Sequence, residues 1–146
     1  MRRKYTFLTA LLLISSSIFG GTTAFAHDEV ASVSPESGST VEAGIIDLAI
    51  VFNEEILATD GATGFDVVVT NAKGEIQPVG CISPLGNSLG ARVAINSAGE
   101  YKVDWHSVSS DGHPSEGSYA FNVSGSADID ADLINNCPRL LIAPAP

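Results

Sequence analysis

Three histidines stand in the chain, and one of them could chelate a metal ion through two of its own nitrogens. His27 follows the segment Ala24-Phe25-Ala26, and cleavage after Ala26 would give it a free α-amine beside its imidazole. Copper(II) favours tetragonal nitrogen and oxygen donors and stands at the top of the divalent affinity order. A histidine at such a position can also arise by chance, so His27 alone does not define a copper site.

A second set of donors lies in the segment from Ser109 to Pro114. Asp111 and His113 are two residues apart, so in an extended stretch they project to the same side. Gly112 allows the backbone to bend so that carboxylate and imidazole converge, and Pro114 restricts His113 to extended conformations. On spacing alone a plain loop explains the same residues, with Asp-Gly making a turn and His-Pro ending it.

Residues 1–26 read as a secretory signal peptide. A basic start at residues 2–4 precedes an apolar run from Phe7 to Ile14, and Ala24-Phe25-Ala26 is a pattern that signal peptidase accepts. The alternative is an uncleaved membrane anchor, but the apolar run is shorter than the ~20 residues that a bilayer span needs. We therefore expect a periplasmic or extracellular protein that begins at His27, with no membrane span in the mature chain.

The remaining chain has the size of one domain and is strongly acidic. Three of the seven Lys and Arg residues precede residue 27 and all 17 acidic residues follow it, which leaves a formal charge of −13 (4 − 17) with His neutral. A net anion repels nucleic acid and anionic membranes, so neither is expected as a partner. Simple solubility explains the acidity without a specific role, and we expect a monomer.

Apolar residues alternate with period two along several segments, which is typical of half-buried strands. Such segments include 48–52, 65–69 and 101–105, and further runs occur at 30–34, 76–79, 91–95 and 119–123. Turn residues separate them. We predict an all-β fold, a small Ig-like or Greek-key β-sandwich of about seven strands. It is not expected to be a true immunoglobulin domain, because Cys137 lies beyond the last strand, and Trp105 is expected in the core.

Two cysteines, Cys81 and Cys137, follow the signal segment. Export would place them where disulfides persist, so we expect one bridge between them. Two free thiols that bind copper(I) are the alternative, since soft thiolates suit that ion. The acidic, Pro-containing tail at 125–146 is expected to be a loose terminus, tethered to the domain if Cys137 is bridged.

Several blocks of the chain together resemble the CopC family of copper-resistance proteins. The early S-P-E-S-G block at 34–38, F-N-E-E at 52–55, Y-K-V-D-W at 101–105 and above all the D-G-H-P block at 111–114 carry the resemblance, which runs over residues 27–124. It implies a small β-sandwich domain that binds copper(II), one ion per chain. It also implies that His27, Asp111 and His113 are the metal ligands, with the α-amine of His27 completing the set.

The chain departs from that family's pattern at three points. Members with a second, copper(I) site carry a methionine-rich segment, whereas Met1 is the only methionine here, so that second site is not expected. His106 stands where most relatives are expected to carry Arg, and alternation places it on the surface opposite Trp105; contact with metal is the alternative. The two cysteines are not part of the pattern.

The expected function is copper homeostasis or resistance, by sequestering copper or delivering it, with a membrane copper transporter as one class of partner. The chain is not expected to be an enzyme. One alternative is a copper-dependent enzyme similar to lytic polysaccharide monooxygenases, which also use an N-terminal His on a β-sandwich; against it, Asp111 would stand where a redox site prefers an open position. The other alternative is a metal-free secreted β-domain.

Overall fold

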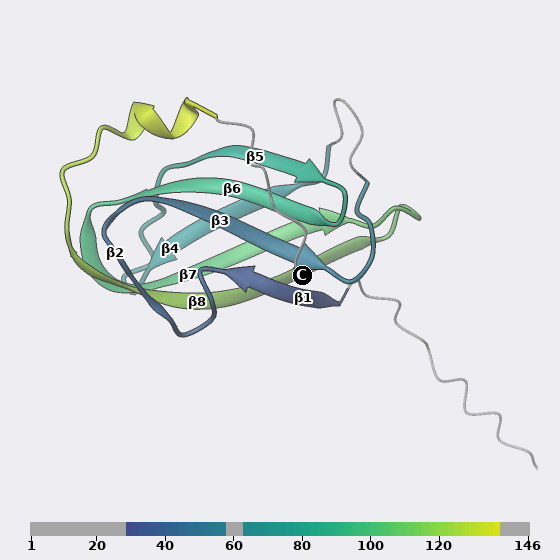
Figure 1. Cartoon of the computed structure of the whole chain (residues 1–146), viewed down its shortest axis with the longest axis horizontal. Helices are drawn as coiled ribbons and strands as arrows, with labels where there is room; N and C mark the ends of the chain where they lie inside the picture. The colour runs from purple at the N-terminus through teal and green to yellow at the C-terminus, as the bar shows by residue number, and fades with distance from the viewer. Residues whose placement is uncertain (1–28, 58–62, 138–146) are drawn as a thin grey trace, which may run out of the picture.

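A computed structural model describes residues 29–57 and 63–137, which form a two-layer β-sandwich (Figure 1). The predicted signal segment, His27 and the end of the tail lie outside these residues. One sheet has the order β1-β3-β6-β5 and the other the order β2-β8-β7-β4. The strands are β1 (Val30–Ser34), β2 (Thr40–Glu42), β3 (Gly44–Phe52), β4 (Asp66–Asn71), β5 (Val79–Leu85), β6 (Ser88–Ile95), β7 (Ser97–Val108) and β8 (Pro114–Ser126).

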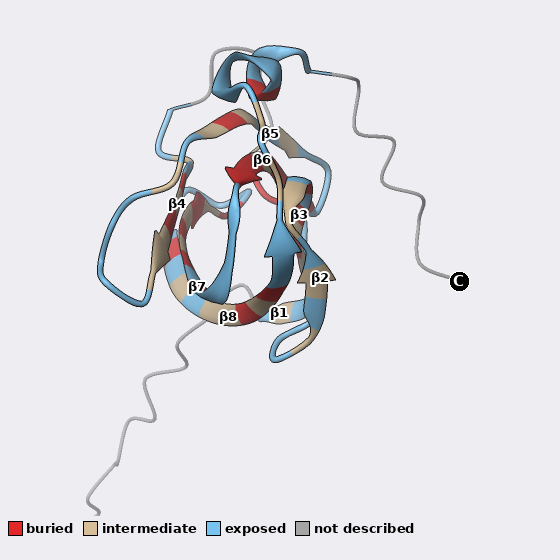
Figure 2. Ribbon diagram, turned by 90° about the vertical axis from the view of Figure 1, so that its left-hand side faces the viewer, coloured by how far each residue is buried: buried red, intermediate tan, exposed pale blue. Residues whose placement is uncertain are grey.

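The all-β sandwich prediction is confirmed, and the core follows the predicted alternation. In β3 the buried residues Ile46, Leu48, Ile50 and Phe52 alternate with more exposed ones, because successive side chains of a strand point to opposite faces. Figure 2, turned by 90° from Figure 1, shows the two sheets facing each other with buried residues in both, and these residues form one hydrophobic core. Trp105 lies in this core with 7% of its surface exposed, as predicted.

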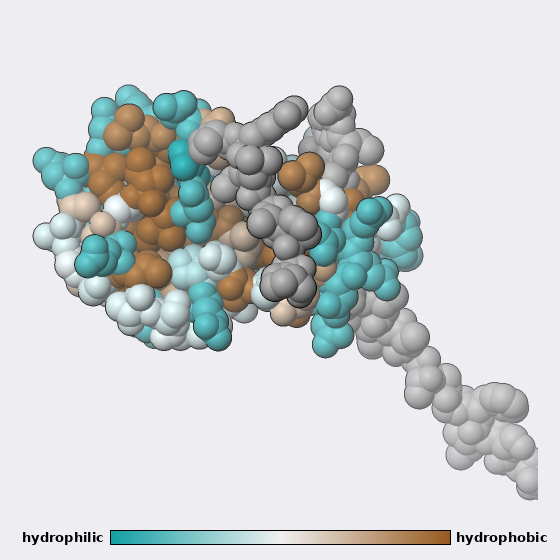
Figure 3. Space-filling model, viewed as in Figure 1, coloured by the Kyte–Doolittle hydropathy of each residue, from teal (hydrophilic) through white to brown (hydrophobic). Residues whose placement is uncertain are grey.

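The outer face of the first sheet is partly apolar (Figure 3). Ile45, near the start of β3, is 36% exposed, and Leu85, at the end of the edge strand β5, is 58% exposed.

Within the described part of the chain, no helix is long and apolar enough to cross a membrane.

Two predicted elements differ from the structure. β2 was not expected from the sequence: it is a three-residue strand that pairs in parallel with β8, and this long-range pairing defines it. The strand predicted at 76–79 is wrong in position, because β5 runs from Val79 to Leu85 and Ile76 makes only an isolated bridge. β5 contains Pro84, which an edge strand tolerates because one of its sides needs no partner.

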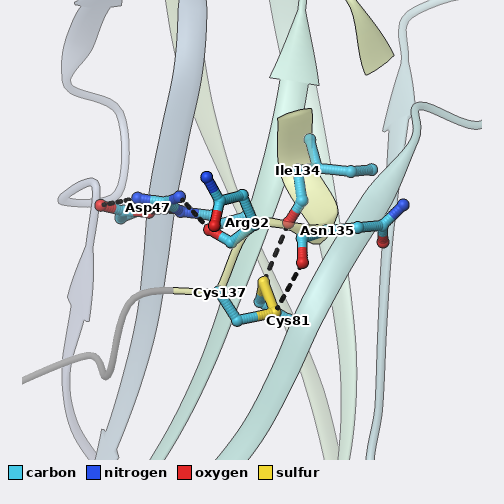
Figure 4. The surroundings of a disulfide bond; sticks show 7 residues. Asp47, Cys81, Arg92, Ile134, Asn135 and Cys137 are labelled. Carbon is cyan, nitrogen blue, oxygen red and sulfur yellow. Dashed lines mark hydrogen bonds and ion pairs between the residues drawn. A yellow bond between two sulfur atoms is a disulfide. The ribbon is translucent and has the colours of Figure 1, made fainter. Parts of the chain in front are cut away.

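The Cys81–Cys137 disulfide is present, as predicted, and it bridges residues 56 apart in the chain. Figure 4 shows how it fastens the segment after β8, which forms the short 3-10 helix η1 (Ala131–Asn135), against β5. Closing a loop of this length lowers the entropy of the unfolded chain. In the simplest model this raises the free energy of unfolding by about 4 kcal/mol.

The tail is not loose over residues 127–137, so that expectation is wrong there. Ile134 is buried and approaches Gly80, and Arg92 donates a hydrogen bond to the Asn136 carbonyl at 3.0 Å. The sulfur of Cys81 lies 2.9 Å from the Ile134 carbonyl oxygen, a close contact rather than a hydrogen bond because a disulfide sulfur has no hydrogen to donate. The remainder of the tail lies outside the described residues.

Candidate metal centre

The loop between β7 and β8 carries the predicted donors and is closed by its own backbone hydrogen bonds. The Gly112 N–H donates to the Ser109 carbonyl at 2.9 Å, and the Ser109 N–H donates to the His113 carbonyl at 2.9 Å. Gly112 has φ of +88°, a left-handed conformation that glycine adopts without steric cost. The loop is therefore a tight turn rather than the extended stretch from which the convergence of Asp111 and His113 was predicted.

The turn brings Asp111 and His113 together. His113 Nδ1 lies 2.8 Å from Asp111 Oδ2, and the two side chains are 75% and 58% exposed, respectively. This ring nitrogen donates to the carboxylate, and Nε2 of His113 has no hydrogen-bond partner among the described residues. Nε2 points away from the carboxylate, so one ion binds both groups only after the His113 ring or the Asp111 carboxylate rotates.

Ser109 positions the carboxylate, and the sequence analysis did not single it out. Its side chain is largely buried, and its hydroxyl donates to Oδ1 of Asp111, while the His113 N–H donates to the same oxygen at 3.2 Å. The hydrogen bond from Ser109, followed by those from the His113 ring and the His113 backbone N–H, lowers the pKa of Asp111 to about 2 from an ordinary 3.8. A serine two residues before an Asp-Gly turn was the available signal, since such side chains commonly bond to nearby backbone and turn groups.

The loop shares a neighbour with the start of β1. In the segment that follows β3, the Glu55 carbonyl accepts from the Ser110 N–H at 3.1 Å, and Ile56 makes an isolated bridge to Ser109. The Asn53 N–H donates to the Glu29 carbonyl at 2.9 Å. Figure 1 shows the start of β1 and the β7–β8 loop at the same end of the sandwich. His27 itself lies outside the described residues, two positions before Glu29.

His106 does not join this loop. It lies on the outer face of its sheet, half-buried, on the side opposite Trp105 as predicted. Among residues 29–57 and 63–137, no three His, Cys, Asp or Glu side chains are gathered so that they could hold a metal ion. Of the predicted set, the described structure brings together Asp111 and His113 only.

The fold and the loop together define the class of protein: a small β-sandwich with an exposed carboxylate–imidazole pair, Asp111 and His113, on the hairpin between β7 and β8. The family model that matches this chain is the CopC domain, over residues 30–124. The chain therefore belongs to the CopC family, a family of copper-resistance proteins.

Individual relatives agree with this assignment. The chain is 29% identical to copper resistance protein C of Xanthomonas campestris pv. juglandis over 122 residues, which cover 79% of this chain and 93% of that one. Among solved structures, PcoC of Escherichia coli is 29% identical with a TM-score of 0.50, over 68% of this chain and 100% of that one. CopC of Methylosinus trichosporium OB3b, at 21% identity, has the same fold, with a TM-score of 0.57 over 71% of this chain and 100% of that one.

Proposed function

We propose that this chain is an exported protein that binds one copper(II) ion through His27, Asp111 and His113 and thereby sequesters or delivers copper. The observation that carries the proposal is the Asp111–His113 pair, exposed on a loop beside the segment that also holds the start of β1. His27 would supply its imidazole and, after removal of residues 1–26, its α-amine. Copper is the cargo here, and no chemical step is assigned to the chain.

The donor set suits copper(II) better than the other common metal ions. Three nitrogens and one carboxylate oxygen form the mixed nitrogen and oxygen set that copper(II) takes in tetragonal geometry. With a pKa of about 2, Asp111 remains an anion at any physiological pH and needs no deprotonation before binding. PcoC is described as methionine rich, whereas this chain has a single methionine, Met1, so soft sulfur ligands of that kind do not enter the proposal.

The decisive experiment concerns the α-amine of His27. Protein that begins at His27 is expected to bind one copper(II) tightly, and one additional Gly before His27 is expected to abolish this, because the amine becomes a peptide nitrogen. Calorimetric titration with copper(II) measures both. A Gly added after Pro146 is the matched control and should leave binding unchanged. Equal affinity with and without the N-terminal Gly would remove the amine from the site.

Copper(II) affinity is expected to fall as pH falls. Imidazoles and α-amines must lose a proton to bind metal, with ordinary pKa values of about 6.5 and about 7.7–8.0, so protons compete with the ion over this range. The lowered pKa of Asp111 keeps the carboxylate charged until about pH 2, so it adds nothing to the loss between pH 8 and pH 5. We expect affinity to decrease by at least about a hundredfold over that interval. A flat profile in competition titrations would contradict a nitrogen-based site.

A further inference from the structure

His106 stands in the middle of a row of three ionisable residues on the outer face of the second sheet. It is the direct cross-strand partner of Asp66 on β4 and of Glu116 on β8. Opposite residues of antiparallel strands share one face of the sheet, with Cβ atoms about 4.5–5.5 Å apart. A histidine therefore lies between two carboxylates, at a place distinct from the β7–β8 loop.

The backbone fixes the tautomer of His106. Its Nδ1 lies 2.5 Å from the carbonyl oxygen of Gly64, and a carbonyl only accepts, so Nδ1 carries the hydrogen. Nε2 then keeps a lone pair when the ring is neutral. Histidines that bind metals commonly have this arrangement, with the second ring nitrogen donating to a backbone carbonyl or a carboxylate.

A surface pocket of about 350 Å³ adjoins His106 and is lined also by Pro114, Ser115 and Glu116. His106 and Glu116 thus face the same hollow. Glu116 makes no ion pair or side-chain hydrogen bond within the described residues, and Asp66 uses one carboxylate oxygen to accept its neighbour's N–H at 2.9 Å. Both carboxylates therefore retain oxygens that can bind or attract a cation.

We propose that His106 and Glu116 form a second, weaker site for a divalent transition-metal ion such as copper(II). Nε2 of His106 and the Glu116 carboxylate would be the two protein ligands, Asp66 would add negative charge, and water would complete the coordination shell. Since the described residues gather no three such side chains around one point, only two protein ligands are assigned and the site is expected to be weak. The nitrogen and carboxylate donors suit copper(II) and zinc(II).

Trp105 provides a local reporter, because it is the only tryptophan and lines an adjoining pocket together with Glu116 and Gly117. Copper(II) is titrated into purified protein that the cell has exported and processed. Tryptophan fluorescence and the heat of binding are recorded. We expect a weak quenching phase at higher copper concentration in addition to any tight phase. His106→Asn and Glu116→Gln should each weaken this phase by about tenfold or more. Glu100→Gln, at an exposed position on β7, is the matched control and should leave it unchanged.

Using both His106→Asn and Glu116→Gln distinguishes loss of a metal ligand from loss of folded protein. His106→Asn removes the bond to Gly64, whereas Glu116→Gln removes only a charge, and thermal unfolding checks both. A weak phase that persists at full strength in both folded variants would overturn the proposal, as would a wild-type protein without a weak phase. Loss of only the tight phase, in Asp111→Asn, would leave the weak phase in place, so this site and the loop site fail independently.

Discussion

Replacing Asp111 with asparagine is expected to weaken copper(II) binding by about a hundredfold or more, since even partners outside the first coordination shell are worth about 10- to 100-fold. Asparagine keeps the shape of the side chain and one carbonyl oxygen, so the Ser109 hydroxyl and the His113 N–H retain an acceptor. The variant loses the negative charge and the pairing with His113 Nδ1 at 2.8 Å. The loss therefore reports on the charge of Asp111 and its pairing with His113, while the hydrogen bonds that close the loop are kept. Competition titration against a chelator of known affinity measures it.

Two further variants separate ligation from other effects of Asp111. Glu36→Gln removes one negative charge from an exposed residue outside the loop and should leave affinity within about twofold, because exposed charges are screened by salt. Ser109→Ala keeps the carboxylate but removes the hydrogen bond that lowers its pKa most, so affinity should fall by a smaller factor than in Asp111→Asn. An Asp111→Asn protein that binds as tightly as wild type would exclude the carboxylate as a ligand.

The strands that the sequence predicted well are those whose burial repeats locally. Leu48, Ile50 and Phe52 alternate with less apolar residues, and this alternation alone predicts β3. β2 has no such pattern, since Val41 is its only apolar residue and its pairing partners on β8 lie more than 80 positions away. β5 was misplaced because its identity depends on pairing with β6 and on a register shift between Gly80 and Ser83, which local periodicity does not encode.

The pair of Asp111 and His113 could be predicted from the sequence, whereas the hydrogen bond from Ser109 that positions Asp111 could not. Asp111 and His113 were predicted from spacing and resemblance, although the convergence was expected in an extended stretch and is produced instead by the turn at Gly112. Ser109 contributes through a hydrogen bond that only the turn creates. The order of the tail likewise depends on contacts that are distant in sequence, namely Cys81 with Cys137 and Arg92 with Asn136.

Gly117 is expected to be the position in the sandwich least tolerant of a side chain. It is the cross-strand partner of Trp105, and a Cβ atom at Gly117 would lie 2.5 Å from Cζ2 and 2.9 Å from Cε2 of that ring. The ring cannot simply withdraw, because Trp105 packs edge-on against Phe52 with centroids 5.2 Å apart. Gly117→Ala should therefore destabilise the fold by about 3 kcal/mol, the cost of overpacking a rigid core. That corresponds to roughly 10–20 °C in Tm for a domain of this size, measured by thermal unfolding.

A double-mutant cycle attributes the cost to the ring. Trp105→Phe removes the outer ring atoms Cζ2 and Cη2, so Gly117→Ala should cost much less in that background than in the wild type. Gly44→Ala is the matched glycine control, because the nearest atom to its added Cβ is the Glu42 carbonyl oxygen at 4.0 Å, and it should change stability by less than about 1 kcal/mol. If Gly117→Ala costs the same beside Phe as beside Trp, contact with the indole is not the cause. If the cost disappears beside Phe, the clash between the added methyl group and the outer ring of Trp105 is its cause, and Gly117 is required because the indole occupies the space of a side chain there.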